Sequence, residues 1–478
     1  MSLLKQYNKI SKPVKASIWF VICSVVQKGI AFIVTPIFTR LLPADQYGIY
    51  NLYTTWLGIF TIFITFNMSY GIFNNAMVKY ENDRARYISA MQGLTLLTSC
   101  VAFILYALFH DFFNSRTGLS SFIMVAMILR IMFTPAQNYW NAYQRYTYNY
   151  RSLIAVTLFM AFITPVISIL LIKIVGMQAD GRVLSALIVQ VIVGSVLWFK
   201  QFKSGKKLFV KEYWCYALGL GLPLIPHYLS QVILNSSDKI MISHICGQEA
   251  VAYYSVAYSI GLVIQLLTTS VNNSLIPWTY QKIKLENYEQ ISKVVNILLL
   301  MLGIAILTFV AFGPEMIRIM APDSYYGARW VVPPVAGSVF FTFLYGVFGN
   351  VEFYYGKTKM IALASTVCAG CNILLNSVFV PLFGYVAAGY TTLICYVGFA
   401  MFHYLMMKKV CDKNMPGVKV YDISFIGIIS IGFIIVLLLT TMLYDFPLIR
   451  YTFILICMIV VFIKRKVFID SIKVIFTR

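Results

Sequence analysis

The chain has 478 residues, of which 60% are hydrophobic and only 12% are charged. Soluble domains carry about 25% charged residues, so this composition excludes a set of soluble domains. A mean hydropathy of +0.79 instead indicates a polytopic integral membrane protein. The net charge of +21 would suggest nucleic acid in a soluble chain. Here we expect it to orient the protein in a bilayer, with no nucleic-acid partner.

Apolar runs separated by short polar breaks predict an all-α fold of about fourteen transmembrane helices. A span needs about 20 apolar residues. The runs lie near residues 14–38, 47–73, 87–109, 119–140, 152–175, 183–200, 213–237, 250–278, 291–313, 328–351, 360–381, 386–407, 422–443 and 447–463. The breaks are too short for a soluble catalytic domain, so all chemistry must occur within the membrane or at its faces.

The distribution of Lys and Arg over the predicted loops sets the orientation. One alternate set of loops, together with both termini, holds 28 of these residues, and the opposite set holds 8. Lys and Arg accumulate on the cytoplasmic side of membrane proteins. We therefore expect both termini in the cytoplasm and an even number of spans. The two residues that belong to neither set, Lys28 and Arg130, lie deep inside predicted helices.

An internal repeat divides the chain. At a shift of 204 residues Asp45 falls on Glu249 and Tyr50 on Tyr254, and at a shift of 208 residues Gly176 falls on Gly384. Each half then holds six helices that start on the cytoplasmic side, as in parallel repeats related by an axis along the membrane normal. We predict two six-helix lobes, residues 1–205 and 206–412, related by a pseudo-two-fold axis, and an additional helix pair with a basic tail at 413–478. The substrate site is expected between such lobes.

Three helix junctions carry a resemblance to a known family. The segment Ser237-Asp-Lys-Ile-Met-Ile-Ser-His-Ile-Cys-Gly-Gln-Glu-Ala-Val-Ala-Tyr-Tyr254 resembles the junction of the seventh and eighth helices in polysaccharide exporters. The stretch from Asn372-Ile-Leu-Leu-Asn376 through Pro381-Leu-Phe-Gly384 to Ala387-Ala-Gly389 is similar to their last junction, and Phe38-Thr-Arg-Leu-Leu-Pro43 through Tyr47-Gly-Ile-Tyr50 to their first.

This resemblance is to the flippases for O-antigen and other polysaccharide repeat units, within the multidrug/oligosaccharidyl-lipid/polysaccharide exporter superfamily. It implies a two-lobed transporter that moves an undecaprenyl-diphosphate-linked oligosaccharide across the bacterial cytoplasmic (inner) membrane by alternating access. The glycan would belong to lipopolysaccharide O-antigen, capsule or a related polysaccharide. A polysaccharide polymerase and a chain-length protein would then be candidate partners.

Lys28 lies in the middle of the first predicted helix, where an ionisable side chain indicates function. Ser24, Lys28 and Thr35 share one helical face because they are four and seven residues apart, and Gln27 adjoins them. We predict that Lys28, with Gln27 and Ser24, faces a central cavity and meets the substrate diphosphate. The alternative is a lysine that snorkels to the cytoplasmic interface.

Arg130 lies comparably deep in the predicted helix 119–140, and its guanidinium suits bidentate binding of phosphate oxygens. The alternative for Arg130 is an ion pair that stabilises one lobe. Few acids lie within the predicted spans, which favours an anionic substrate.

The predicted helix 213–237 carries a polar stripe of His227, Gln231, Asn235 and Asp238 at helical spacing. Such a stripe is too costly to face lipid, so it lines either a substrate cavity or a contact between helices. Pro223 and Pro226 predict a break in this helix. Asp238 is the deepest acid that we identify; it is a candidate site for a coupling proton or sodium ion, or it simply pairs with Lys239.

No enzyme signature is present. Gly356-Lys-Thr358 lacks the first glycine of a phosphate-binding loop, because Val351 occupies that position. We expect no cofactor, no metal site and no catalytic residue, so transport must use an ion gradient or the substrate's own gradient. The alternatives are a multidrug cation exporter, which needs buried carboxylates, and a peptidoglycan-precursor flippase. A membrane polymerase or glycosyltransferase would need a longer extramembrane loop.

Overall fold

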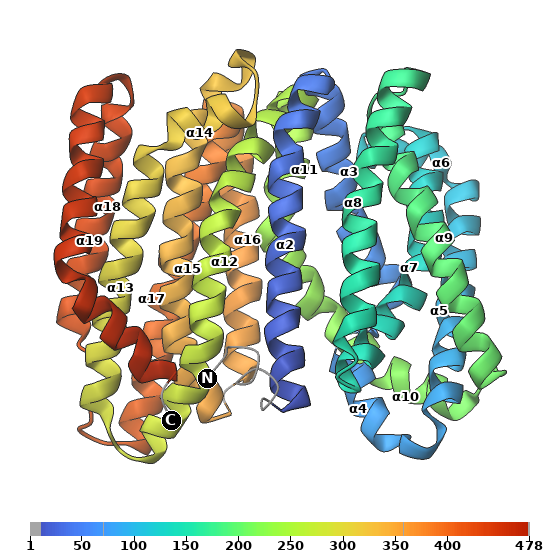
Figure 1. Cartoon of the computed structure of the whole chain (residues 1–478), viewed down its shortest axis with the longest axis horizontal. Helices are drawn as coiled ribbons and strands as arrows, with labels where there is room; N and C mark the ends of the chain where they lie inside the picture. The colour runs from blue at the N-terminus through green and yellow to red at the C-terminus, as the bar shows by residue number, and fades with distance from the viewer. Residues whose placement is uncertain (1–10, 70, 357, 477–478) are drawn as a thin grey trace, which may run out of the picture. The chain divides into compact units, whose positions relative to one another are not determined.

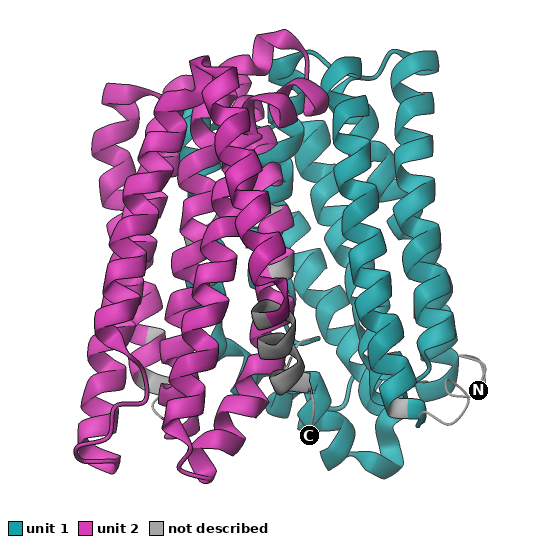
Figure 2. Ribbon diagram, turned by 60° about the vertical axis from the view of Figure 1, so that its left-hand side comes forward, with its two compact units in different colours: residues 1–244 teal, residues 245–478 magenta. Residues whose placement is uncertain are grey.

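The computed structural model describes residues 11–69, 71–356 and 358–476. At a few helical positions, among them His227, Gln231 and Asn235, only the backbone is described. All regular elements within these ranges are helical (Figure 1). The chain forms two compact units, unit 1 with residues 1–244 and unit 2 with residues 245–478 (Figure 2). The boundaries predicted for the two lobes, at 205 and 412, stay a prediction.

Unit 1 contains six long helices that follow the first six predicted runs, and then a broken helix. In chain order its elements are α2 (Lys12–Leu41), α3 (Ala44–Thr65), α4 (Gly71–Lys79), the 3₁₀ turn η1 (Glu81–Asp83), α5 (Arg84–Leu108), α6 (His110–Thr117), α7 (Ser121–Tyr146), α8 (Tyr150–Val175), α9 (Ala179–Gly205), α10 (Lys211–Gly221), η2 (Leu222–Leu224) and α11 (Ile225–Cys246). The break between α10 and α11 confirms the interruption predicted from Pro223 and Pro226. The last two residues of α11 belong to unit 2.

Unit 2 holds the remaining long helices. Its elements are α12 (Gln248–Lys284), α13 (Tyr288–Ala311), α14 (Gly313–Met320), η3 (Asp323–Val331), α15 (Val332–Tyr354), α16 (Thr358–Phe383), α17 (Tyr385–Asn414), α18 (Ile423–Met442), η4 (Leu443–Asp445) and α19 (Pro447–Phe476). Two ion pairs fasten the last two helices to the rest of the unit: Arg450 with Glu315 of α14, and Arg329 of η3 with Asp445 at 3.0 Å.

The described residues contain an α-helix of 20 or more residues for each of the fourteen predicted runs. Twelve candidate membrane spans are long and apolar enough to cross a bilayer, so the protein is a multi-pass membrane protein. The two helices outside this set are α3 and α11. Both carry many polar side chains, such as Asn51, Thr54 and Thr55 in α3 and the predicted stripe in α11, which lower their mean hydropathy.

The order of elements repeats from unit 1 to unit 2. The eight-residue helices α6 and α14 begin at residues 110 and 313, which are 203 positions apart, and each follows a long helix directly. Gly176 and Gly384 end the equivalent helices α8 and α16 with φ values of +77° and +70°, a conformation that favours glycine. These equivalences agree with the internal repeat found in the sequence. The symmetry axis itself stays a prediction.

Close helix packing in unit 1 holds α7 and α9 together. A Cβ atom on Gly194 of α9 would lie 2.7 Å from the backbone oxygen of Phe133 in α7, so only glycine permits this approach. Buried side chains of α3 and of the first half of α7 form a core that includes Leu52, Tyr53 and Met127. This packing fixes where the polar residues of α3, α7 and α9 meet.

Candidate substrate site

Arg130 lies within the core of unit 1 and has a neutral partner. It is half-buried on α7, and its Nη1 donates a hydrogen bond to the Tyr53 hydroxyl of α3 at 3.1 Å. Within the described residues no carboxylate lies at ion-pair distance from Arg130. The ion pair considered as an alternative is therefore not seen in that part of the chain.

Arg182, which the sequence analysis missed, provides a second cation that packs against α3. Its guanidinium carbon lies 3.6 Å from the ring centre of Tyr50, 4.0 Å from that of Phe38 and 5.4 Å from that of Tyr47. Its Nη1 is buried without a hydrogen-bond partner in the part of the chain that is described. Arg182 lies one residue before the predicted helix 183–200, so it was counted as a loop charge. α9 begins at Ala179 and includes it.

The two arginines are connected through one face of α3. Tyr47, Tyr50 and Tyr53 are three residues apart, and the rings of Tyr50 and Tyr53 lie 5.9 Å from centre to centre. We call Arg130, Arg182 and these three tyrosines the arginine–tyrosine cluster. Two cations held by neutral aromatic groups form a favourable setting for an anion.

Acids lie near the arginine–tyrosine cluster without neutralising it. Asp45 precedes Tyr47 by two residues, and its carboxylate accepts a hydrogen bond from the Gln46 amide at 2.9 Å. Asp180 precedes Arg182 by two residues on α9. Neither acid forms an ion pair with Arg130 or Arg182 among the described residues. No ion pair with these two acids therefore offsets either guanidinium charge in the described part of the chain.

No contact among the described residues joins the predicted site residues of α2 to Arg130. Lys28 and Gln27 are exposed on this helix, and Lys28 has no hydrogen-bond or ion-pair partner within the described ranges. Ser24 is exposed as well, and its hydroxyl donates to the backbone oxygen of Phe20 at 2.9 Å. α2 packs on α8 within unit 1. The role predicted for Lys28, Gln27 and Ser24 stays a prediction.

The polar stripe of the predicted helix 213–237 falls on α11. The side chains of His227, Gln231 and Asn235 lie outside the described part of the structure, and only their backbone is placed. Asp238 is 2% exposed, which agrees with a polar face directed away from lipid. Its proposed use by a coupling ion is untested.

Unit 2 contains an acid that is buried at least as deeply as Asp238. Glu352 on α15 and His403 on α17 are both 0% exposed, and Glu352 Oε1 lies 2.7 Å from His403 Nδ1. The sequence analysis named only Asp238 as a buried acid, and the structure adds Glu352. Glu352 was missed because it lies one residue past the predicted helix 328–351. His403 lies inside the predicted helix 386–407, and a polar residue at that position was the signal that could have identified the pair.

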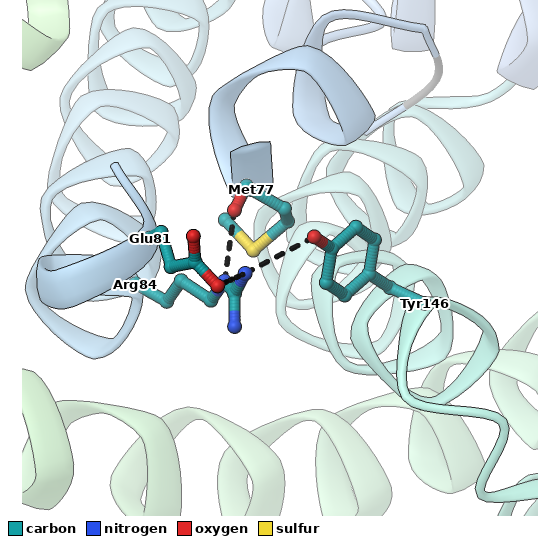
Figure 3. Close-up of polar contacts among 4 residues, drawn as sticks. All are labelled: Met77, Glu81, Arg84 and Tyr146. Atoms are coloured by element: carbon teal, nitrogen blue, oxygen red, sulfur yellow. Dashed lines mark hydrogen bonds and ion pairs between the residues drawn. The ribbon is translucent and has the colours of Figure 1, made fainter. Parts of the chain in front are cut away.

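Contacts at one corner of unit 1 hold the end of α7 in place. Figure 3 shows Arg84 at the start of α5 between Met77, Glu81 and Tyr146. Arg84 Nε donates to the Met77 carbonyl at 2.8 Å, and Nη2 donates to the Tyr146 hydroxyl at 3.0 Å and to Glu81 at 3.3 Å. One guanidinium thus joins α4, η1 and the helix that carries Arg130.

The neighbouring helix α10 is joined to the same corner by Tyr213, whose hydroxyl donates a hydrogen bond to Asp83 of η1. Burial, and then this bond to a carboxylate, raises the pKa of Tyr213 to about 12. Trp214 Nε1 also donates to the Ala90 carbonyl of α5 at 2.8 Å. These two bonds hold α10, the first part of the broken helix, against η1 and α5.

The family model described as polysaccharide biosynthesis protein matches residues 14–283, more than half of the chain. The chain belongs to this family. A second model, described as MatE, matches residues 223–378. Protein 1 of the Lsg locus of Haemophilus influenzae is 22% identical over 373 residues, which are 74% of this chain and 88% of the relative. The family agrees with the one that the helix junctions resemble.

Solved structures share the fold of this family member. The lipid II flippase MurJ in an inward closed conformation aligns with a TM-score of 0.72 at 14% identity, over 94% of this chain and 99% of that one. An inward-facing multidrug resistance MATE transporter of the MOP superfamily aligns with a TM-score of 0.60 at 12% identity, over 81% and 96%. The chain is thus a member of the polysaccharide biosynthesis protein family that has the fold of these solved transporters.

Proposed function

We propose that the protein is a flippase for an undecaprenyl-diphosphate-linked oligosaccharide in the bacterial cytoplasmic membrane. The observation that carries this proposal is the arginine–tyrosine cluster, in which Arg130 and Arg182 have aromatic and phenolic partners but no carboxylate partner among the described residues. A cation within a membrane-embedded unit is costly unless it serves a ligand. A diphosphate supplies the missing negative charge and accepts several hydrogen bonds from each guanidinium.

The transport cycle that we propose is alternating access. The diphosphate is bound by Arg130 with help from Lys28, while the polar side chains Ser24, Gln27, His227, Gln231 and Asn235 contact the glycan, and the polyprenyl chain stays in lipid. Asp238 is the residue proposed for a coupling proton or sodium ion. The glycan belongs to O-antigen, capsule or a related polysaccharide, whose polymerase and chain-length protein are the proposed partners. Both termini are proposed to lie in the cytoplasm.

A peptidoglycan-precursor flippase is the second candidate. The fold similarity to the lipid II flippase MurJ favours it. Both candidates move a lipid-linked diphosphate and differ in the glycan. A multidrug cation exporter is disfavoured, because the arginine–tyrosine cluster repels a cation.

The test is translocation in proteoliposomes that contain the purified full-length protein. Three labelled substrates are compared: an undecaprenyl-diphosphate oligosaccharide, lipid II and a cationic dye. We expect transport of the oligosaccharide lipid, and loss of this transport in Arg130→Ala. Transport of lipid II alone would support the second candidate. Export of the dye alone would overturn the proposal.

A further inference from the structure

The Glu352–His403 pair differs from the other ion pairs of unit 2, because both of its side chains are fully buried. Glu352 Oε1 and His403 Nδ1 lie 2.7 Å apart, and neither residue is exposed. Glu352 Oε2 and His403 Nε2 are buried without hydrogen-bond partners among the described residues. A buried polar atom without a partner costs free energy, so these two atoms need an explanation beyond packing.

The surroundings of the pair are aromatic and uncharged. The His403 ring lies 4.6 Å from the centre of Phe399 and 5.5 Å from that of Tyr345. Within the described residues no Lys or Arg forms an ion pair with Glu352. The neighbouring elements contribute neutral titratable groups: Tyr345 on α15, Tyr404 on α17, Cys368 on α16, Tyr280 on α12 and Tyr421 before α18.

The net charge of the pair depends on how many protons it holds, and this charge decides whether the pair is stable in an uncharged environment. The hydrogen bond between Nδ1 and Oε1 holds one proton whichever atom carries it. With that proton alone the pair has a net charge of −1, and with a second proton the pair is neutral. A net charge buried without a counter-ion is strongly unfavourable. The closed packing of α15 on α17 therefore favours the neutral, two-proton pair.

A polar pocket lies about one helical turn from the pair, which does not itself line it. The pocket has a volume of about 750 Å³ and is lined in part by Tyr404 and Met407 of α17. Met407 follows His403 by one helical turn, and Tyr404 packs on Phe348, one turn before Glu352. The rim of the pocket holds the charged groups of this region: Glu289, Lys408, Asp412, Lys419 and Asp422.

We propose that Glu352 and His403 form a proton-binding site that exchanges protons through this pocket. Binding of one proton takes the pair from a net charge of −1 to neutral, release reverses this change, and no other bond is altered. Opening of the packing between α15 and α17 admits water and stabilises the charged form. Proton release is thereby linked to a conformational change. That this change drives transport rests on the function proposed above.

Infrared difference spectroscopy of the full-length protein in nanodiscs tests the site without any substrate. The probe is the proton itself, added in a pH titration. We expect a carboxyl band that changes with pH in the wild type, is absent in Glu352→Gln and is altered in His403→Gln. Glu249→Gln is the matched control, because Glu249 is an exposed acid of unit 2. If Glu352→Gln does not fold, Glu352→Asp takes its place; this variant keeps a carboxyl group, so we expect its band to be shifted rather than absent.

The second measurement is translocation with and without an imposed proton gradient. We expect Glu352→Gln to lose the acceleration by the gradient and to keep transport down the substrate gradient. If the wild type moves no lipid-linked substrate but shows the carboxyl band, the proposed function fails and the proton site stands. A band that is unchanged in both Glu352→Gln and His403→Gln would overturn the proton site and leave a structural brace between α15 and α17.

Discussion

Arg130 Nη1 and the Tyr53 hydroxyl are joined by a hydrogen bond of 3.1 Å that gives a membrane-embedded cation a neutral partner. The phenol orients the guanidinium without cancelling its charge, because a hydroxyl contributes a dipole only. A carboxylate at the same place would form a self-contained ion pair and leave nothing for a ligand. The tyrosine at this position therefore leaves the cation free of an acidic partner, as the anion binding that we propose for Arg130 requires.

Removal of Arg130 should weaken anion binding. A hydrogen bond to a charged group contributes about 1.5–3 kcal/mol, so Arg130→Ala should raise the Kd for undecaprenyl diphosphate by about 10- to 100-fold. Tyr53→Phe keeps the cation and should change this Kd far less. Binding to protein in nanodiscs measures the effect, with Arg151→Ala as the control at an exposed arginine. An unchanged Kd in well-folded Arg130→Ala would make Arg130 a packing residue.

Arg182 should tolerate lysine poorly. Its flat guanidinium stacks on Tyr50 at 3.6 Å, and an ammonium group cannot reproduce that stacking. A desolvated cation–π contact contributes about 2 kcal/mol. We expect Arg182→Lys and Arg182→Ala to lower the thermal unfolding temperature by similar amounts. A lysine variant as stable as the wild type would show that charge alone matters at this position.

Charge reversal at Lys28 should be worse than truncation if the residue attracts a diphosphate. Lys28→Ala removes the attraction, whereas Lys28→Glu adds repulsion. Translocation rates, normalised to the amount of folded protein, distinguish the two. Lys173→Ala, at an exposed lysine on α8, is the matched control. Equal effects of Ala and Glu would point to packing or snorkelling rather than to substrate attraction.

The Tyr213–Asp83 bond should make stability depend on alkaline pH. The pKa of Tyr213 is raised to about 12 in the fold, above the ordinary value of about 10, so the neutral phenol is the stabilised form. This stabilisation is complete below about pH 10 and is lost as the pH rises to about 12. Thermal unfolding of the wild type and of Tyr213→Phe should therefore differ most at neutral pH and converge above about pH 10. Parallel curves across this range would mean that the bond contributes nothing measurable.

Particular residues show how far sequence reasoning reaches into the site. Arg130 and the break near Pro223 were found because a charge or a proline inside an apolar run violates a local pattern. Arg182 was missed because it lies at the edge of a predicted helix, where an arginine looks like an ordinary loop charge. Arg182 is identified by its contacts with the rings of Phe38, Tyr47 and Tyr50, and these residues lie far from it in the sequence.

The sequence by itself determined the membrane class, the positions of the long helices, the repeat and the family. These properties can be read from local composition and from periodic patterns, because a membrane span needs about 20 consecutive apolar residues. Only the tertiary structure decided which polar side chains meet. Glu352 and His403 are 51 positions apart, and their contact depends on how α15 and α17 are rotated against each other. Side-chain packing sets that rotation, and no short stretch of sequence contains it.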